Sequence, residues 1–176
     1  CEKLSVVNNI SSVNVFAPYV FANTSLTSLS IDNAVINEGA FTNVKTLETV
    51  NLGANVEICS YAFANNENLT NLSLLASTIG SYAFENCIKL STLELPNVEV
   101  VKEGAFKGCK SISTINLPNV EVIGDYAFAN NSALSTANMD SVVSIGSYAF
   151  ATTGKNASNL LVNLELSNVQ HIGSYA

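Results

Sequence analysis

Arginine and tryptophan are absent from this chain of 176 residues, and histidine and methionine occur once each. All seven basic residues are lysines, so no guanidinium group is present to hold a phosphate in a bidentate fork. Only 12% of the residues are charged, the net charge is −7, and the lysines form no cluster. This composition argues against a nucleic-acid-binding protein.

Residues that could carry acid–base or metal chemistry are also scarce. The only histidine is His171, and the four cysteines, which form no CxxC pair, are Cys1, Cys59, Cys87 and Cys109. We find no pair of acids, no nucleophile–base pair and no set of metal ligands at a suitable spacing. The sequence therefore predicts a protein without catalytic residues, without a cofactor and without a metal site.

Long apolar runs are missing too. No stretch approaches the ~18 consecutive apolar residues of a membrane-spanning helix, and the first residues form no charged-then-apolar leader. Cys1 fits the lipidated first residue of a processed bacterial lipoprotein, and a cut from a longer chain is the alternative interpretation. We expect contact with a membrane only through an anchor outside the folded repeats.

What the chain has instead is an internal repeat. Phenylalanine recurs at steps of 20, 22, 21, 22, 22 and 22 residues, usually directly after alanine, at Phe21, Phe41, Phe63, Phe84, Phe106, Phe128 and Phe150. A regular period of this size is typical of a solenoid, in which stacked units share a core that one unit alone cannot bury. We expect these phenylalanines to form a stacked aromatic row inside that core.

Each unit contains two further phrases. Six residues after most of the phenylalanines comes L-x-x-L-x-L, as in "LTNLSL" from Leu69, whose last four residues alternate apolar and polar like a half-buried strand. A second segment, V-x-x-I-G, precedes the Y-A-F phrase and is interpreted as another short strand. The remaining ten or so residues have room for a single helical turn rather than a long helix.

This combination of phrases resembles the BspA-like class of leucine-rich repeats. The resemblance implies an α/β but β-rich solenoid, a right-handed superhelix of about 22-residue units with parallel strands on the concave face and short strands or helical turns elsewhere. We expect one domain over residues 1–176 with about seven repeats. Within it, residues 1–25 form a truncated or capping unit, residues 151–160 form a loop insertion, and the array continues past residue 176.

Single glycines recur four residues before the phenylalanine position. They are Gly80, Gly124, Gly146 and Gly173, and Asn37 replaces glycine in one unit. Because glycine adopts positive φ angles without a steric penalty, we expect a left-handed backbone at this column.

Two cysteines share another column, three residues after the phenylalanine. Cys87 and Cys109 would lie on adjacent rungs, close enough for a disulfide, but parallel side chains make the required geometry awkward. We therefore expect both to be buried free thiols that pack as small apolar residues, and we expect the same of Cys59.

All six tyrosines lie two residues before the phenylalanine position, and Gly39 and Gly104 interrupt their column. One interpretation is a partly buried row that covers the edge of the core. The alternative is an exposed aromatic row that contacts a glycan or a protein, for which the candidates are Tyr61, Tyr82, Tyr126 and Tyr148.

The polar positions of the first strand face outward on the expected concave surface. Asparagine and threonine in register can bind a partner through weak, multivalent contacts, or can simply stabilise the sheet through cross-strand hydrogen bonds. The candidate contact residues on this face are Asn71, Thr92, Glu94, Thr114 and Asn116.

Taken with the resemblance, these features predict a non-catalytic binding or adhesion module at the cell surface or in secreted form. The resemblance implies partners that are host or matrix proteins, or glycans. A structural spacer that holds another domain away from the cell is the alternative.

Overall fold

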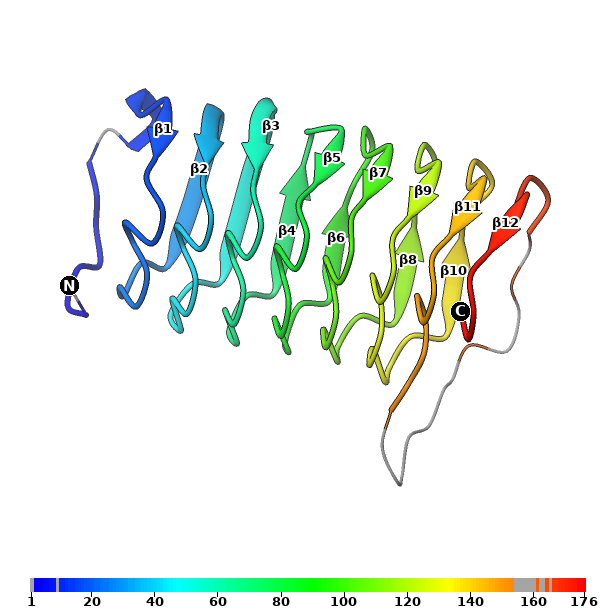
Figure 1. Cartoon of the computed structure of the whole chain (residues 1–176). Coiled ribbons are helices and arrows are strands. Elements are labelled where there is room, and N and C mark those ends of the chain that lie inside the picture. The colour runs from blue at the N-terminus through cyan, green and yellow to red at the C-terminus, as the bar shows by residue number, and fades with distance from the viewer. Residues whose placement is uncertain (1, 9, 154–160, 162–163, 165) are drawn as a thin grey trace.

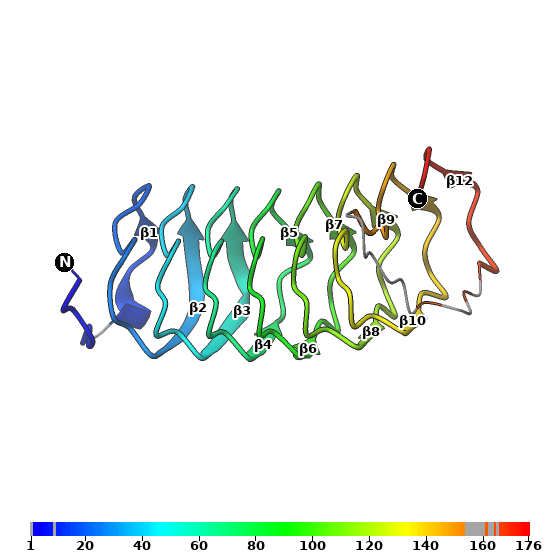
Figure 2. The same ribbon diagram turned by 90° about the horizontal axis from the view of Figure 1, so that it is seen from below.

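The computed structural model describes residues 2–8, 10–153, 161, 164 and 166–176. The chain winds into a parallel β-solenoid whose coils follow one another in a nearly straight row (Figures 1 and 2). The only helix among the described residues is the three-residue 3-10 helix η1 (Ile10–Ser12), and none of these residues lies in a helix that could cross a membrane. Turns therefore stand where the sequence led us to expect helical turns.

The first row of strands is formed by the leucine phrases. Its members are β2 (Ser28–Ile36), β3 (Thr49–Ile58), β4 (Asn71–Leu74), β6 (Thr92–Glu94), β8 (Thr114–Asn116) and β10 (Thr136–Asn138). Neighbouring strands are parallel, and each residue pairs with the residue at the same position of the next repeat. Asn71, for example, pairs with both Thr49 and Thr92. The hydrogen-bonded pairing stops between β6 and β8, which belong to separate sheets.

The second row contains the predicted short strands before the Y-A-F phrase. Its five-stranded sheet is built from β5 (Thr78–Ile79), β7 (Val100–Val101), β9 (Val122–Ile123), β11 (Ser144–Ile145) and β12 (His171–Ile172). The first coils differ, because β2 and β3 are long strands that run through both rows. The end of β2 pairs with β1 (Val15–Phe16) on one side and with the end of β3 on the other.

The phenylalanine row lies inside the coils, as the sequence predicts. Phe41, Phe63, Phe84 and Phe106 are fully buried, and only the first ring of the row, Phe21, is half-buried. Rings from Phe41 to Phe150 stack with centroids 5.2–5.7 Å apart. The leucine and isoleucine columns of the two strand rows complete one continuous core.

Each turn around a phenylalanine from Phe21 to Phe128 contains two left-handed residues, and neither is in the glycine column predicted for this role. One lies two residues before the phenylalanine and is tyrosine or glycine, with φ of 56–60°. The other lies two residues after it, with φ of 57–75°, and is Asn23, Asn43, Asn65, Asn86, Gly108 or Asn130. Asparagine and glycine suit this backbone, whereas tyrosine rarely adopts it.

Gly80, Gly124, Gly146 and Gly173 have ordinary φ angles, so our prediction for this column was wrong. These glycines are needed for a different reason, which is the close stacking of the coils. A Cβ atom on any of them would lie 2.3–2.7 Å from a backbone atom of the preceding coil.

In the column three residues after the phenylalanine, the side chains of Asn66, Cys87 and Cys109 bond to the preceding coil. The thiol of Cys87 donates to the carbonyl of Phe63 at 3.4 Å, and that of Cys109 donates to Phe84 at 3.1 Å. Both cysteines are free and buried, as predicted, and burial raises the pKa of the Cys109 thiol well above its usual value. These thiols therefore serve the packing of the coils.

Candidate binding surface

The tyrosine side chains form short stacked rows along one edge of the solenoid. The rings of Tyr61 and Tyr82 are parallel with centroids 5.1 Å apart, and Tyr126 stacks on Tyr148 at 5.0 Å. Tyr148 also stacks on Tyr175 at 5.0 Å. Faces that are occupied by neighbouring rings in these stacks cannot stack against a sugar.

The glycines that interrupt the tyrosine column have a specific role. The ring of Tyr82 leans over Gly104, where a Cβ atom would lie only 2.3 Å from it, and its hydroxyl donates to the carboxylate of Glu103. Tyr19 repeats this arrangement over Gly39, with a 2.8 Å bond to Glu38. Glu-Gly therefore replaces Ser-Tyr in the turn that receives the preceding tyrosine.

These glutamates also keep the tyrosines protonated. The hydrogen bond to Glu103 is the main reason that the pKa of Tyr82 is raised, and the bond to Glu38 does the same for Tyr19. Lys107 lies 5.5 Å from the centroid of the Tyr82 ring. Tyr82 is thus engaged by a ring, a carboxylate and a cation, whereas the first rings after each glycine, Tyr61 and Tyr126, remain 39% and 36% exposed.

The predicted polar residues of the first strand row lie on an outward face. Thr92, Glu94, Thr114 and Asn116 are exposed, as is Asn71, while the residues between them on each strand face the core. The structure brings Asn71 beside Thr92, and Glu94 lies on the same strand as Thr92. Thr114 and Asn116 lie on the neighbouring strand β8, which is next to β6 without hydrogen-bonded pairing. The face lies on a segment of the coil different from the tyrosine turns.

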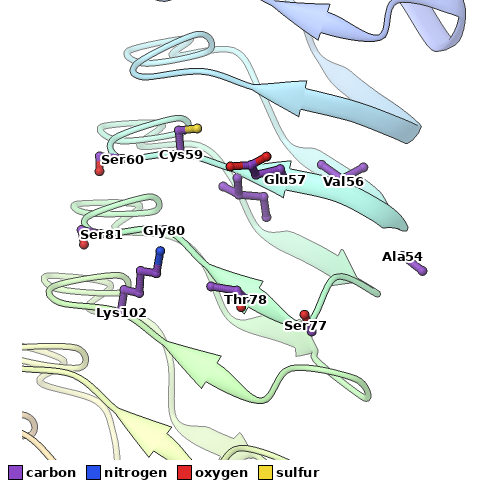
Figure 3. Close-up of a pocket in the computed structure, with 11 residues that line it drawn as sticks. Ala54, Val56, Glu57, Cys59, Ser60, Ser77, Thr78, Gly80, Ser81 and Lys102 are labelled. Carbon is purple, nitrogen blue, oxygen red and sulfur yellow. The ribbon is translucent and has the colours of Figure 1, made fainter.

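A third feature, which the sequence did not reveal, is a hollow of about 500 Å³ on the outer side of the second row, shown in Figure 3. Three successive coils line it. Glu57 and Cys59 come from the end of β3 and the turn that follows, Thr78 and Gly80 come from the next coil, and Lys102 comes from the one after that. In the close-up, the amino group of Lys102 points towards Gly80.

The hollow lies where the hydrogen-bonded ladder of the second row is interrupted. In other coils the amide at the glycine column donates to the coil before it, as in the bonds from Cys59 to Ile36 at 2.9 Å and from Gly124 to Val101 at 2.8 Å. Among the described residues, the amide of Gly80 has no such partner, and β3 and β5 are not paired. Polar backbone groups are thus left open at this point.

Cys59 lines this hollow and is only half-buried, so our prediction that it is a buried thiol like Cys87 was wrong. Its pKa is raised by partial burial and by the nearby carboxylate of Glu57, and the ammonium group of Lys102 opposes that rise. The thiol therefore lies within the electric field of both charges.

Two signals in the sequence mark this place. The step from Phe63 to Phe84 is 21 residues instead of 22, and Cys59 and Lys102 both stand in the glycine column, on either side of Gly80. Each is a minor irregularity by itself. Only the winding of the coil shows that they meet at one place.

The chain was compared with known families and structures. The family model for the "BspA type Leucine rich repeat region" matches the chain in six copies, over residues 1–78 and 56–176. No curated protein matches the chain.

Two solved structures share its fold. One is a leucine rich cell surface protein from Faecalibacterium prausnitzii A2-165, with a TM-score of 0.61 and 24% identity over 98% of this chain and 42% of that one. The other is a leucine-rich repeat protein from Bacteroides ovatus ATCC 8483, with a TM-score of 0.52 and 20% identity over 91% and 55%. The chain thus spans about half the length of these structures or less.

Proposed function

Because the chain belongs to the BspA-type leucine-rich repeat family, we propose that it is a non-catalytic binding module of a cell-surface or secreted protein. It recognises a host or matrix protein, or a glycan, through the outward face of its first strand row. The observation that carries this proposal is the exposed polar face itself. Threonine and asparagine, with almost no charge, repeat there from coil to coil.

Such a face suits weak contacts that add up along the array. Each coil presents two outward side chains on a strand whose spacing to the next strand is about 4.8 Å. Thr114 and Asn116 of one coil lie in register with Thr136 and Asn138 of the next. A partner that is itself repetitive, such as a polysaccharide or a fibrous protein, would gain affinity from simultaneous contacts.

The test is an adhesion measurement on cells and on matrix-coated surfaces with two matched sets of variants. Thr114→Lys with Asn116→Lys changes the strand face, and Tyr126→Gly with Tyr148→Gly changes the tyrosine row while keeping a residue that accepts the left-handed backbone. We expect the first pair to abolish attachment and the second to leave it unchanged. Attachment that survives the strand-face pair would refute the proposal.

A structural spacer is the second candidate, and one observation favours it. The stacked phenylalanine row and the hydrogen bonds between turns, such as those of 2.8 Å from Phe63 to Ala83 and from Phe84 to Ala105, join each coil firmly to the next. Replacing the array in the full-length protein by an unrelated rigid module of equal length distinguishes the two roles. A spacer is replaceable in this way, whereas a binding module is not.

A further inference from the structure

We infer that the hollow between β3, β5 and Lys102 binds a small zwitterion with the dimensions of a tripeptide, its ammonium group held by Glu57 and its carboxylate by Lys102. This site is independent of the strand face proposed above as the adhesive surface. The argument rests on the size of the hollow, on two opposite charges without ionic partners, and on the number of rungs between the coils that carry them.

The size of the hollow is that of a ligand site. Its volume of about 500 Å³ falls within the range of about 300–1,000 Å³ that is common for small-molecule pockets. The lining includes Ala54 and the hydroxyl-bearing residues Ser60 and Ser81, while Val56 and Ile58 border the hollow with side chains that are buried in the core. A ligand that fills the hollow would therefore meet mainly polar groups.

The two charges in the hollow are not used by the protein. The ion pairs among the described residues join Lys45 to Glu67 and Lys107 to Glu85, so that neither Glu57 nor Lys102 has an ionic partner there. Both line the same hollow, and both influence the thiol of Cys59, which lies on the same coil as Glu57. A ligand with one charge of each sign would satisfy both groups through charge-assisted hydrogen bonds.

The separation of these charges sets the length of the ligand. Glu57 and Lys102 belong to coils two rungs apart, and a rung is about 4.8 Å. Three extended residues span about 10 Å, so the two ends of a tripeptide reach the two charges. Gly80 belongs to the coil between them, and its backbone lies close against that of Ile58 and Cys59.

The experiment is a titration of the whole chain with triglycine, followed by NMR through the backbone amides of Thr78, Gly80 and Ser81. We expect saturable shifts at these amides. Glu57→Thr and Lys102→Gly should each weaken binding at least about tenfold, which corresponds to 1.4 kcal/mol. Both variants borrow residues from the neighbouring coils, where Thr78 and Gly80 or Gly124 occupy the matching positions, so the fold should persist.

Capped ligands and control variants complete the design. N-acetyl-triglycine lacks the ammonium group, so it should bind Glu57→Thr no more weakly than it binds the unmodified chain. Triglycinamide lacks the carboxylate, so it should bind Lys102→Gly no more weakly than it binds the unmodified chain. Glu121→Thr and Lys110→Ser change exposed charges outside the hollow and should have no effect. The proposal is overturned if the shifts do not saturate with triglycine. It is also overturned if the unmodified chain binds the capped ligands as tightly as triglycine, or if the two hollow variants bind triglycine as tightly as the unmodified chain does.

Discussion

The N-terminal coils and the C-terminal coils turn the corner between the two strand rows in different ways. In β2 and β3 the strand continues around the corner, with Asp32–Asn33 and Gly53–Asn55 bending it. In later coils the strand ends and a turn follows, at Pro96–Asn97, Pro118–Asn119 and Asp140–Ser141. Both kinds of corner connect the first strand row to the second, but one does so with a bent strand and the other with a turn.

The turn corners are held by their own row of side-chain bonds. Asn97 donates to the carbonyl of Leu75 at 3.3 Å, Asn119 donates to Pro96 at 2.6 Å, and Ser141 donates to Pro118 at 2.6 Å. The continuous strands instead bond through their backbones, with a register shift between Ile31 and Asn33. The hollow opens between β3, which continues around the corner, and β5, whose coil passes the corner at residues 75–77 with neither a continuous strand nor a two-residue turn. A repeat protein can thus create a distinct local site simply by changing its corner.

The place between β3 and β5 where the corner changes is called the junction. The largest expected effect tests whether the packing of the core is loosened at this junction. Phe63→Ala and Phe106→Ala should both lower the free energy of unfolding by about 3–5 kcal/mol, because each removes a fully buried ring. Phe63 flanks the junction and Phe106 lies among turn corners, yet the stacking of Phe63 on Phe84 is as close as elsewhere, at 5.2 Å. Urea unfolding measures both losses. A much smaller loss for Phe63→Ala would mean that the junction loosens the core as well as the outer ladder.

The second effect concerns the ladder itself. The amide of Gly80 should exchange with solvent at least about a hundredfold faster than that of Gly124, because only the latter is protected by a bond to the preceding coil. Native-state hydrogen exchange followed by NMR measures both rates in one sample. Equal protection of the two amides would show that β3 and β5 are joined in solution as the other strands of this row are.

A third effect concerns another position at which the repeat breaks a bonding pattern. Asn66 uses its amide to donate to Phe41 and to accept from Val44, but Asn131, in the same column, is buried and has no bonding partner for either end of its amide among the described residues. Asn131→Cys should therefore raise the free energy of unfolding by about 1 kcal/mol, because it removes an unsatisfied polar group. Thermal or urea unfolding measures the change.

The matched control for that substitution is Asn66→Cys. It removes two hydrogen bonds, so it should lower the stability by about 1–3 kcal/mol. Changes of the same sign in the two variants would contradict our description of this column.

The sequence alone predicts the periodic part of this structure well. The phenylalanine row, the two short strands of the coils from β4 to β11 and the buried thiols Cys87 and Cys109 all follow from alternation and spacing. These features depend on burial, and burial is written into the pattern of apolar residues. The family assignment follows from the same phrases.

The backbone angles and the junction could not be predicted in this way. Tyrosine rarely adopts a left-handed backbone, so the φ of 56–58° at the tyrosines is unexpected from the sequence. The only hint is that Gly39 and Gly104, which accept this backbone, replace tyrosine in the same column. The stacking of the tyrosine rings could not be predicted either, because it depends on the lean of each ring over the neighbouring coil. The hollow depends on how three coils are offset, which no single spacing records.

The smallest expected effect is a change in the alkylation rate of Cys59, which reports on the charges of Glu57 and Lys102. Cys59 reacts as its thiolate, and partial burial together with Glu57 raises its pKa, so at pH 8 it should alkylate more slowly than an unperturbed cysteine. Glu57→Thr removes one cause of the rise and should speed the reaction about two- to fivefold, whereas Lys102→Gly removes the opposing cation and should slow it by a similar factor. Peptide mapping after iodoacetamide separates Cys59 from the buried Cys87 and Cys109, which serve as internal controls. Opposite changes from the two variants require that both charges face one thiol, and equal rates in all three proteins would mean that the charges do not converge on this junction.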